Sequence, residues 1–294
     1  MLLNCNEYRD NIAKRIKEDY KIDGTSVFIQ VGNNPASTTY INQKKKACDK
    51  AGIQYDHIIL KENITEEELV LKIKKYNELN SIIGIMVQLP LPSHINEDVV
   101  ISAIKPEKDI DGFTHINKGK LMTNDKTAII PCTPLGIIKL LENINFDVQG
   151  KNVVVVGRSN IVGKPMTQLL INRGATVTCC NSKTPKETLI DLILNSDLFI
   201  SAIDKPDYFD IQYFGKDDLA QLSNIIAIDV GIFKIENKLH GNIAKELYDY
   251  FKAITPVPGG VGPMTIAGVI SNIVLCALLQ NKNSLTIKIG GSHE

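Results

Sequence analysis

Two side chains that can take part in proton transfer stand four residues apart near the N-terminus. Tyr40 and Lys44 share one face if residues 37–51 form a helix. A lysine acts as a base near neutral pH only where burial or neighbouring groups favour its neutral form, and a phenol beside it can orient it or stack on a ring. The alternative is an ordinary solvated helix face, because Lys45 and Lys46 follow directly.

Two carboxylates alternate in the stretch Lys108-Asp-Ile-Asp-Gly112. Asp109 and Asp111 point to opposite sides of an extended segment, so one can hydrogen-bond a ligand while the other pairs with Lys108. The alternative is a turn closed by Gly112. Two carboxylates without further ligands fit neither calcium nor zinc, and the five histidines show no ligand spacing, so we predict no metal site.

A glycine-containing turn, Gly157-Arg-Ser-Asn-Ile-Val-Gly163, follows an apolar strand pattern and opens a helical one. Such a turn exposes backbone N–H groups, and a helix N-terminus favours an anion, so the turn can hold the phosphates of a dinucleotide. Ser159 stands where the G-x-G-x-x-G fingerprint has its second glycine, so a plain strand–turn–helix is the alternative.

The following strand ends without an acidic residue, in Cys179-Cys-Asn-Ser-Lys-Thr184. An NAD-specific site usually has an acidic residue there to hold the ribose 2′-hydroxyl. Ser182, Lys183 and Arg158 can instead hold a 2′-phosphate, which favours NADP; the alternative is a solvated turn.

The stretch from Thr255 to Thr265 contains three prolines and three glycines directly before a helical pattern. Glycines let a backbone approach a flat ligand closely, and prolines stiffen that backbone. Pro263 suits the first turn of the following helix.

The elements that must position these side chains alternate between strand and helix, which predicts parallel sheets covered by helices on both faces. Ser37 is the expected N-cap of the first helix, Gly52 its stop, and Thr65-Glu-Glu-Glu68 a capping box. The first series contains strands 27–31, 54–60 and 82–87 with helices 37–51, 65–79 and 96–104. The second contains strands 152–156, 175–179, 198–202 and 225–230, a hairpin-like stretch to residue 241, and helices 134–142, 163–173, 186–195 and 263–280.

Length and composition limit the class of protein. A chain of 294 residues predicts about two domains. Thirty-three basic and 33 acidic residues give no net charge, which argues against a nucleic-acid or membrane-surface partner. The apolar run 266–279 is short for a membrane span, and residues 1–19 are too polar for a secretory signal. Six cysteines without a C-x-x-C pair indicate reduced thiols in a cytoplasmic protein.

In this order, the motifs resemble those of the methylenetetrahydrofolate dehydrogenase/methenyltetrahydrofolate cyclohydrolase family, over about residues 7–280. The tyrosine–lysine helix and the proline–glycine stretch are the most specific of them. The matching stretches are 31–37 with Tyr40 and Lys44, 87–92, 108–112, 131–134, 157–166, 228–231 and 256–265.

The resemblance implies two three-layer α/β/α domains, the second a Rossmann-type NADP-binding domain, with the active site in the cleft between them. Residues 1–138 and 264–294 would form the catalytic, folate-binding domain, and residues 139–263 would bind NADP. The helix after Pro263 would thus return to the first domain. The resemblance also implies a cytoplasmic homodimer, joined through the cofactor domains, in the one-carbon metabolism that serves purine biosynthesis.

The implied reactions are oxidation of 5,10-methylenetetrahydrofolate by NADP and hydrolysis of the methenyl product to 10-formyltetrahydrofolate. Lys44 would assist water addition and proton transfer, Tyr40 would stack on or orient the folate, Gln88 would hydrogen-bond Lys44, and Asp111 would accept from the pterin N–H groups. The residues expected where pterin and nicotinamide meet are Pro258, Gly259 and Gly260. Those expected to bind the cofactor are Gly157, Arg158, Ser159, Gly163, Ser182, Lys183 and Ile232.

The sequence departs from the family pattern at three positions, all in the expected cofactor domain. Asp204 replaces a usual glycine, Asn181 a usual histidine, and Asn242 a usual aspartate. An added carboxylate near the cofactor would weaken NADP binding, so a predominantly cyclohydrolase enzyme is the second hypothesis. A sensing module without catalysis and an NADP oxidoreductase acting on a hydroxy acid are less favoured, because the catalytic set and the proline–glycine stretch are both present.

Overall fold

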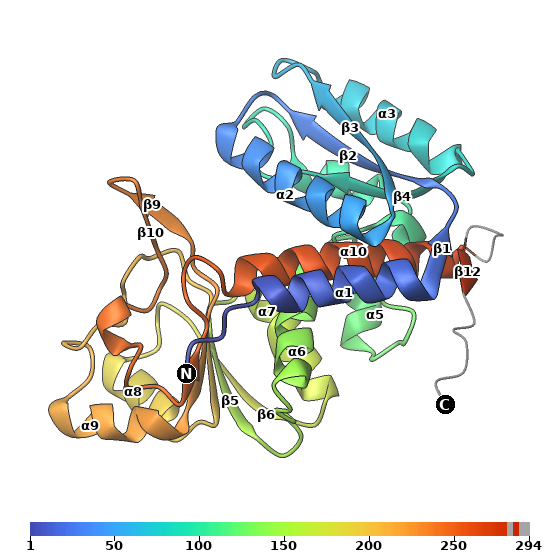
Figure 1. The fold of residues 1–294 in the computed structure, drawn as a ribbon. Coiled ribbons are helices and arrows are strands. Elements are labelled where there is room, and N and C mark those ends of the chain that lie inside the picture. Colours follow the sequence, from blue (N-terminus) through green and yellow to red (C-terminus); the bar gives the residue numbers. More distant parts are fainter. Residues whose placement is uncertain (281–284, 288–294) are drawn as a thin grey trace, which may run out of the picture. The chain divides into compact units, whose positions relative to one another are not determined.

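The structure, a computed structural model, describes residues 1–280 and 285–287. The chain forms two compact units, each built from two separate segments (Figure 1). The five-stranded unit consists of Met1–Tyr8 and Thr133–Thr265, and the three-stranded unit of Arg9–Cys132 and the chain from Ile266 onward. The chain therefore passes from one unit to the other inside three helices, α1, α6 and α10. The assignment of folate and NADP to residues 1–138 with 264–294 and to 139–263 remains a prediction.

The three-stranded unit has a parallel sheet in the order β3-β2-β4. One face of this sheet packs against α1, α2 and α10, whose buried residues share a cluster with Phe28 and Met86. The other face packs against α3 and α4, whose buried residues share a second cluster with Val27 and Ile29. Its elements are α1 (Asn6–Asp19), β1 (Tyr20–Ile22), β2 (Thr25–Val31), α2 (Pro35–Ala51), β3 (Gln54–Leu60), α3 (Glu66–Glu78), β4 (Ile82–Val87), α4 (Glu97–Ser102), α5 (His115–Met122), α10 (Val261–Leu279) and β12 (Leu285–Ile287).

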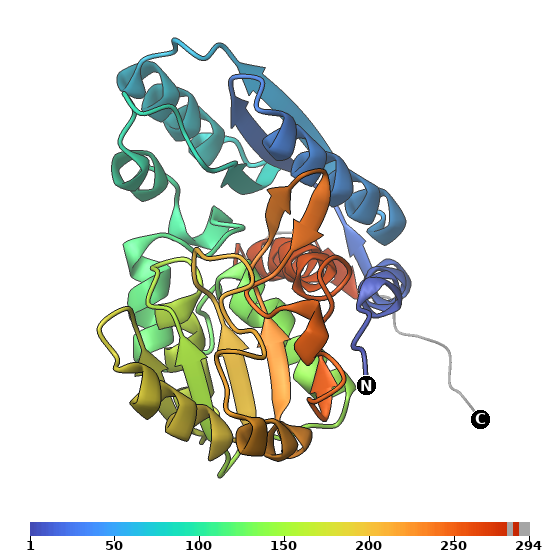
Figure 2. The ribbon, with the colours of Figure 1, turned by 90° about the vertical axis from the view of Figure 1, so that its left-hand side faces the viewer.

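Among the described residues, α10 is the one helix long and apolar enough to cross a membrane, with 19 residues and a mean hydropathy of 1.9. The sequence predicts a helix from residue 263, whereas α10 begins at Val261. Prolines and glycines in residues 256–263 are atypical of a helix and hide its first turn from a sequence pattern. In the structure 72% of this helical window is buried. The α10 residues from Ile266 onward share one core with α1, beside which the helix lies in both views (Figures 1 and 2). We therefore interpret α10 as the core helix of the three-stranded unit.

The five-stranded unit has a parallel sheet in the order β11-β8-β7-β5-β6. Val154 and Val156 share a buried cluster with α8 and α9, and α7 packs against β5 and β6. Its elements are α6 (Cys132–Asn143), β5 (Asn152–Val156), α7 (Gly163–Asn172), β6 (Thr176–Cys180), α8 (Lys186–Leu194), β7 (Leu198–Ser201), α9 (Lys216–Gln221), β8 (Ile226–Asp229), β9 (Phe233–Ile235), β10 (Lys238–His240) and β11 (Ala253–Ile254).

The strand order of this sheet defines a switch point beside β5. The chain leaves β5 for β6 on one side and then crosses to β7 on the other side. In open parallel sheets, ligands bind in the crevice outside the carboxyl ends of the strands where the order reverses in this way. The loops after β5 and β7 flank that crevice.

Most predicted elements are confirmed, and the differences concern helix starts and the helices α1, α5 and α9, which the sequence pattern did not predict. Helix α2 begins at Pro35, so the prediction of Ser37 as its N-cap was wrong; Asn34 Oδ1 accepts the Ser37 backbone N–H at 3.2 Å. The capping box of Thr65 and Glu68 and the hairpin formed by β9 and β10 are confirmed.

Candidate active site

Lys44 lies on the face of α2 that packs against the three-stranded sheet. Ile41 and Cys48, three residues before it and four after it, belong to the buried cluster on that face. As a result Lys44 is only 6% exposed, whereas Lys46 is exposed. The solvated-face alternative is therefore wrong for Lys44. Tyr40, one turn earlier, is half-buried, and burial raises the pKa of its phenol.

The amino group of Lys44 is held by two acceptors at the end of β4. Nζ donates to Gln88 Oε1 at 3.0 Å and lies 3.1 Å from Met86 Sδ. The other end of the Gln88 amide donates to the Leu89 carbonyl at 2.7 Å, which orients its oxygen toward the lysine. The predicted hydrogen bond between Gln88 and Lys44 is confirmed. Met86 was missed, although positions 86 and 88 alternate on a strand and so point to the same side.

Asp111 is a half-buried carboxyl that interacts electrostatically with Lys44. Burial raises the pKa of Asp111 to about 6, against the positive charge of Lys44, which lowers it; the negative charge of Asp109 raises it further. Cys132 Sγ lies 3.8 Å from Asp111 Oδ1 and receives a contact of 3.4 Å from Asn272 Nδ2. The carboxyl thus interacts with the positive charge of the lysine and is partly shielded from water.

Asp109 has a structural role. It is 1% exposed, and its two oxygens accept hydrogen bonds from the Gly112 and Thr114 backbone N–H groups at 2.9 and 2.8 Å and from Asn117 Nδ2 at 3.0 Å. Gly112 closes this turn with φ +69°. The turn alternative therefore holds for Asp109, while Asp111 stays available for a ligand.

Lys108 stabilises the end of α3. The residue is 4% exposed, and its amino group donates to the backbone carbonyls of Asn77, Leu79 and Tyr76 at 2.7, 2.9 and 3.3 Å. A cation at this end of a helix is favoured by the carbonyl groups and the helix dipole. Lys108 thereby anchors the segment that carries both aspartates.

In the glycine turn after β5, at the switch point, the backbone comes very close to the backbone of the loop after β7. Gly157 has φ +122°, and a Cβ there would collide with the Ala202 carbonyl oxygen. A Cβ at Gly163 would collide with the Gly157 carbonyl oxygen. Ser159 Oγ accepts the N–H groups of Val162 and Gly163 at 3.1 and 3.3 Å and so caps the start of α7. The turn has the tight backbone that a dinucleotide cradle requires.

The residues after β6 lie in the loop adjacent to this turn. Val156 pairs with Cys180, and the Gly157 N–H donates to the Cys180 carbonyl at 2.9 Å. Arg158 and Lys183 are exposed in these two adjacent loops. With no acidic side chain in residues 179–184, this donor set fits a 2′-phosphate.

The remaining predicted cofactor residues also lie in loops at the carboxyl edge of the five-stranded sheet. Ser182 is exposed in the loop after β6, and Ile232 is 46% exposed after β8, at the carboxyl edge of the same sheet. Asn181, a departure from the family pattern, accepts the Lys183 N–H at 3.0 Å and so shapes that loop.

The proline–glycine stretch is held by the N-terminal segment. The Cys5 N–H donates to the Gly259 carbonyl at 2.7 Å, and Gly259 has φ +103°. A Cβ at Gly260 would lie 2.6 Å from the Pro256 carbonyl oxygen. Pro258 is exposed. These residues belong to the five-stranded unit, so their expected meeting with the folate residues remains a prediction.

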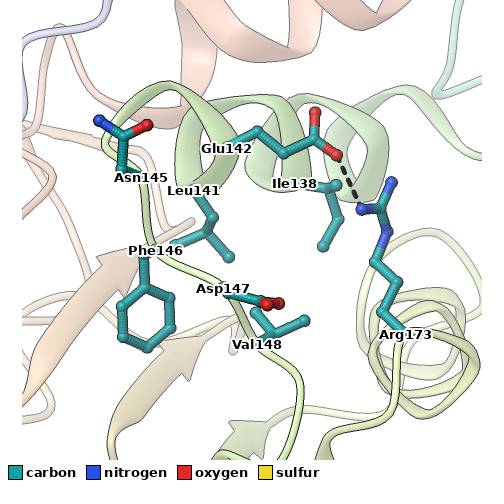
Figure 3. Close-up of a pocket in the computed structure, with 8 residues that line it drawn as sticks. All are labelled: Ile138, Leu141, Glu142, Asn145, Phe146, Asp147, Val148 and Arg173. Atoms are coloured by element: carbon teal, nitrogen blue, oxygen red, sulfur yellow. Dashed lines mark hydrogen bonds and ion pairs between the residues drawn. The ribbon is translucent and has the colours of Figure 1, made fainter.

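A pocket of about 470 Å³ lies at the opposite, amino-terminal edge of the five-stranded sheet (Figure 3). An ion pair of 2.7 Å between Arg173 and Glu142 borders it. It contains none of the predicted site residues. It is lined by Ile138, Leu141, Glu142, Asn145, Phe146, Asp147, Val148 and Arg173.

These features define a two-unit α/β enzyme with a dinucleotide-binding sheet and a separate lysine–glutamine–carboxylate site. Comparison with known families agrees. The catalytic-domain model of tetrahydrofolate dehydrogenase/cyclohydrolase matches residues 3–111, and the NAD(P)-binding-domain model of that family matches residues 131–281. The chain belongs to the tetrahydrofolate dehydrogenase/cyclohydrolase family.

Individual relatives are similar over most of their length. The bifunctional protein FolD of Agathobacter rectalis is 47% identical over 272 residues, which cover 91% of this chain and 94% of the relative. The crystal structure of the bifunctional FolD dehydrogenase/cyclohydrolase of Campylobacter jejuni superimposes with a TM-score of 0.88 at 39% identity, covering 95% of this chain and 99% of that one.

A third relative was solved with a cofactor. The Trypanosoma brucei dehydrogenase-cyclohydrolase, complexed with NADP and an inhibitor, has a TM-score of 0.83 at 30% identity, covering 95% of this chain and 98% of that one. These names carry both activities, so the hypothesis of a predominantly cyclohydrolase enzyme gains no support from the comparisons.

Proposed function

We propose that this enzyme oxidises 5,10-methylenetetrahydrofolate with NADP and then hydrolyses the 5,10-methenyl product to 10-formyltetrahydrofolate. The single observation that carries the proposal is the buried Lys44, whose amino group is hydrogen-bonded to Gln88 beside Asp111. The names of the relatives, which combine dehydrogenase and cyclohydrolase, support the same pair of reactions.

In the hydrolytic step, Lys44 moves the proton. Water adds to the methenyl carbon and loses a proton, and opening of the ring returns a proton to the departing nitrogen. The amino group held by Gln88 takes that proton at Nζ in its neutral form and returns it to the departing nitrogen as the ammonium ion. Asp111 accepts from the N–H donors of the pterin, and Tyr40 stacks on or orients the ring.

In the oxidative step, the chain aligns the reactants, because hydride transfer needs no protein base. NADP, when bound, accepts the hydride from the methylene carbon. Gly157, Ser159 and Gly163 form the cradle for its phosphates, Arg158, Ser182 and Lys183 take the 2′-phosphate, and Ile232 contacts the cofactor. The residues proposed to line the meeting place of pterin and nicotinamide are Pro258, Gly259 and Gly260.

The same proposal assigns folate to residues 1–138 with 264–294 and NADP to residues 139–263. The enzyme is a cytoplasmic homodimer, joined through its cofactor domains, and its product serves purine biosynthesis. The six free thiols support a reducing compartment.

The test compares Lys44→Met with Lys46→Met, a matched change on the exposed side of the same helix. We expect Lys44→Met to lower enzymatic methenyl hydrolysis by about 10²–10⁴-fold, the usual contribution of a proton-transferring side chain, while far-ultraviolet circular dichroism stays the same. Lys46→Met keeps both activities. Unchanged hydrolysis in Lys44→Met refutes the role of Lys44. Failure of the wild type to reduce NADP with methylenetetrahydrofolate refutes the bifunctional assignment.

A further inference from the structure

A buried polar cluster ties three loops together at the carboxyl edge of the five-stranded sheet. Asp229, at the end of β8, is 1% exposed, and Asn242, after β10, is fully buried. The Asp229 carboxylate accepts the backbone N–H groups of Gly231, Asn242 and Ile243 at 3.0, 2.8 and 2.9 Å. These bonds fix the backbone of Asn242 relative to β8.

The Asn242 side chain then holds the loop after β7. Its Nδ2 donates to the carbonyls of Ile203 and Lys205, both at 2.8 Å, and its Oδ1 accepts the Ile203 N–H at 3.3 Å. The amide therefore uses both of its N–H groups and one of the two lone pairs of its oxygen. The residue between the two carbonyls, Asp204, is exposed.

Beside this loop, which carries Asp204 in place of the family's usual glycine, the arrangement needs an amide, although the family usually has an aspartate at position 242. An ionised carboxylate of the same shape has no donor and would face two carbonyl oxygens at hydrogen-bonding distance, which is repulsive in a buried site. An alanine would leave both partly buried carbonyls without this donor.

The loop that Asn242 holds forms one side of the switch-point crevice. The Ala202 N–H donates to the Val156 carbonyl at 2.8 Å, and the Ala202 carbonyl contacts Gly157 so closely that no side chain fits there. The loop after β7 therefore begins, at Ala202, directly beside the glycine turn.

We propose that Asn242 is a positioning residue for NADP: its side-chain amide fixes the backbone of residues 203–205, which forms the wall of the cofactor crevice facing the glycine turn. This proposal rests on the assignment of NADP to that crevice. Asn242 does not touch the cofactor itself; it acts through the loop.

The test replaces Asn242 by aspartate and measures NADP binding by calorimetry, KM and kcat for the oxidation, and methenyl hydrolysis. We expect the Kd for NADP to rise at least tenfold in Asn242→Asp, while the kcat of hydrolysis stays within twofold. The matched control is Asn195→Asp, whose amide donates to the Asp191 carbonyl at 2.8 Å on the exposed end of α8. It should leave NADP binding unchanged.

A second variant separates loop positioning from general damage. In Asn242→Asp combined with Asp204→Gly, the glycine gives the loop backbone freedom to turn its carbonyls away from the new carboxylate. We expect this double variant to recover at least part of the lost affinity, beyond the effect of Asp204→Gly alone. Damage to the unit as a whole gives no such recovery.

The outcomes are distinct. If wild-type protein does not bind NADP, the proposed function fails. If it binds NADP and folded Asn242→Asp binds equally well, the positioning role of Asn242 fails. If Asn242→Asp does not fold, amide hydrogen exchange on the wild type decides: slower exchange of residues 202–207 with NADP supports the proposal, and unchanged exchange overturns it.

Discussion

Two carboxylates two residues apart differ in what surrounds them. The oxygens of Asp109 are occupied by backbone and amide donors, so this residue shapes the turn. Asp111 is instead half-buried, interacts electrostatically with Lys44 and has a thiol contact from Cys132, and burial raises the pKa of its carboxyl to about 6. A carboxyl kept in such a position costs stability when it ionises, and we attribute this cost to folate recognition.

Asp111→Asn should therefore stabilise the protein while weakening folate binding. The folded state holds the Asp111 proton more tightly than the unfolded state does, because the folded pKa of about 6 exceeds the ordinary aspartate pKa of 3.8. The wild-type free energy of unfolding thus falls as pH rises from about 4 to 6, and the variant lacks this loss. We expect a variant more stable by about 1–3 kcal/mol at pH 7 and equally stable at pH 4.

Urea unfolding at several pH values measures this difference, and the KM for methylenetetrahydrofolate should rise in the same variant. Asp56→Asn, on the exposed side of β3, is the control and should change neither quantity. A variant less stable than wild type at pH 7 contradicts the assignment.

The roles of Lys44, Gln88 and Asp111 were predicted from the resemblance to the family, because the helical spacing of Tyr40 and Lys44 alone left a solvated face as the alternative. The alternation of β4 fixes the direction of Gln88, and the helical spacing of Ile41, Lys44 and Cys48 fixes that of the lysine. The joint role of Asp229 and Asn242 could not be predicted, because hydrogen bonds between loops depend on how the strands are ordered in the sheet.

At the scale of elements, α3 has a stabilising group at each end. Thr65 and Glu68 form the capping box at its start, and the amino group of Lys108 donates to three carbonyl oxygens at its end. The capping box could be predicted, because it is a local sequence pattern. The second interaction could not, because Lys108 comes from 29 residues beyond Leu79.

Lys108→Met should lower the free energy of unfolding by about 2–3 kcal/mol, because it leaves buried carbonyls without a charged donor. Lys105→Met is the matched control: its ion pair with Glu78, at 3.0 Å, is exposed, and its loss should cost less than about 1 kcal/mol. Urea unfolding of both variants measures the difference. Equal effects of the two substitutions would contradict a capping role for Lys108.

Helix α1 shows a signal that could have been used. Its buried residues include Ala13 and Ile16, and Ile12 packs against the same core. This spacing is helical and predicts the helix, although the charged residues between these positions make the segment polar overall. Strands such as 54–60 and 152–156 were predicted at their observed bounds because glycine or polar residues mark both ends.

At the scale of the whole molecule, the three-stranded unit depends on a helix that comes late in the chain. Ile266, Val269, Ile270 and Ile273 of α10 are fully buried in its core. Burial of each such side chain stabilises a fold by roughly 1.5–3 kcal/mol, and four of them together match the total stability of a typical domain.

Truncation after Thr265 should therefore unfold residues 9–132 while leaving the five-stranded unit complete. We expect trypsin to digest the N-terminal part rapidly, methenyl hydrolysis to be lost, and NADP to slow digestion of the remaining fragment. The full-length chain is the control. A truncated chain whose residues 9–132 resist digestion would show that α10 is dispensable for that core.

The interleaved segments also set an order of events during synthesis on the ribosome. Residues 9–132 are made first, but their core stays open until α10 has emerged, after the whole five-stranded unit has been translated. At typical translation rates this delay is on the order of ten seconds. During it, the sheet face that carries Phe28 and Met86 has no α10 to cover it. The nascent chain thus presents a hydrophobic surface to ribosome-associated chaperones, and the unit encoded second is the first to finish folding.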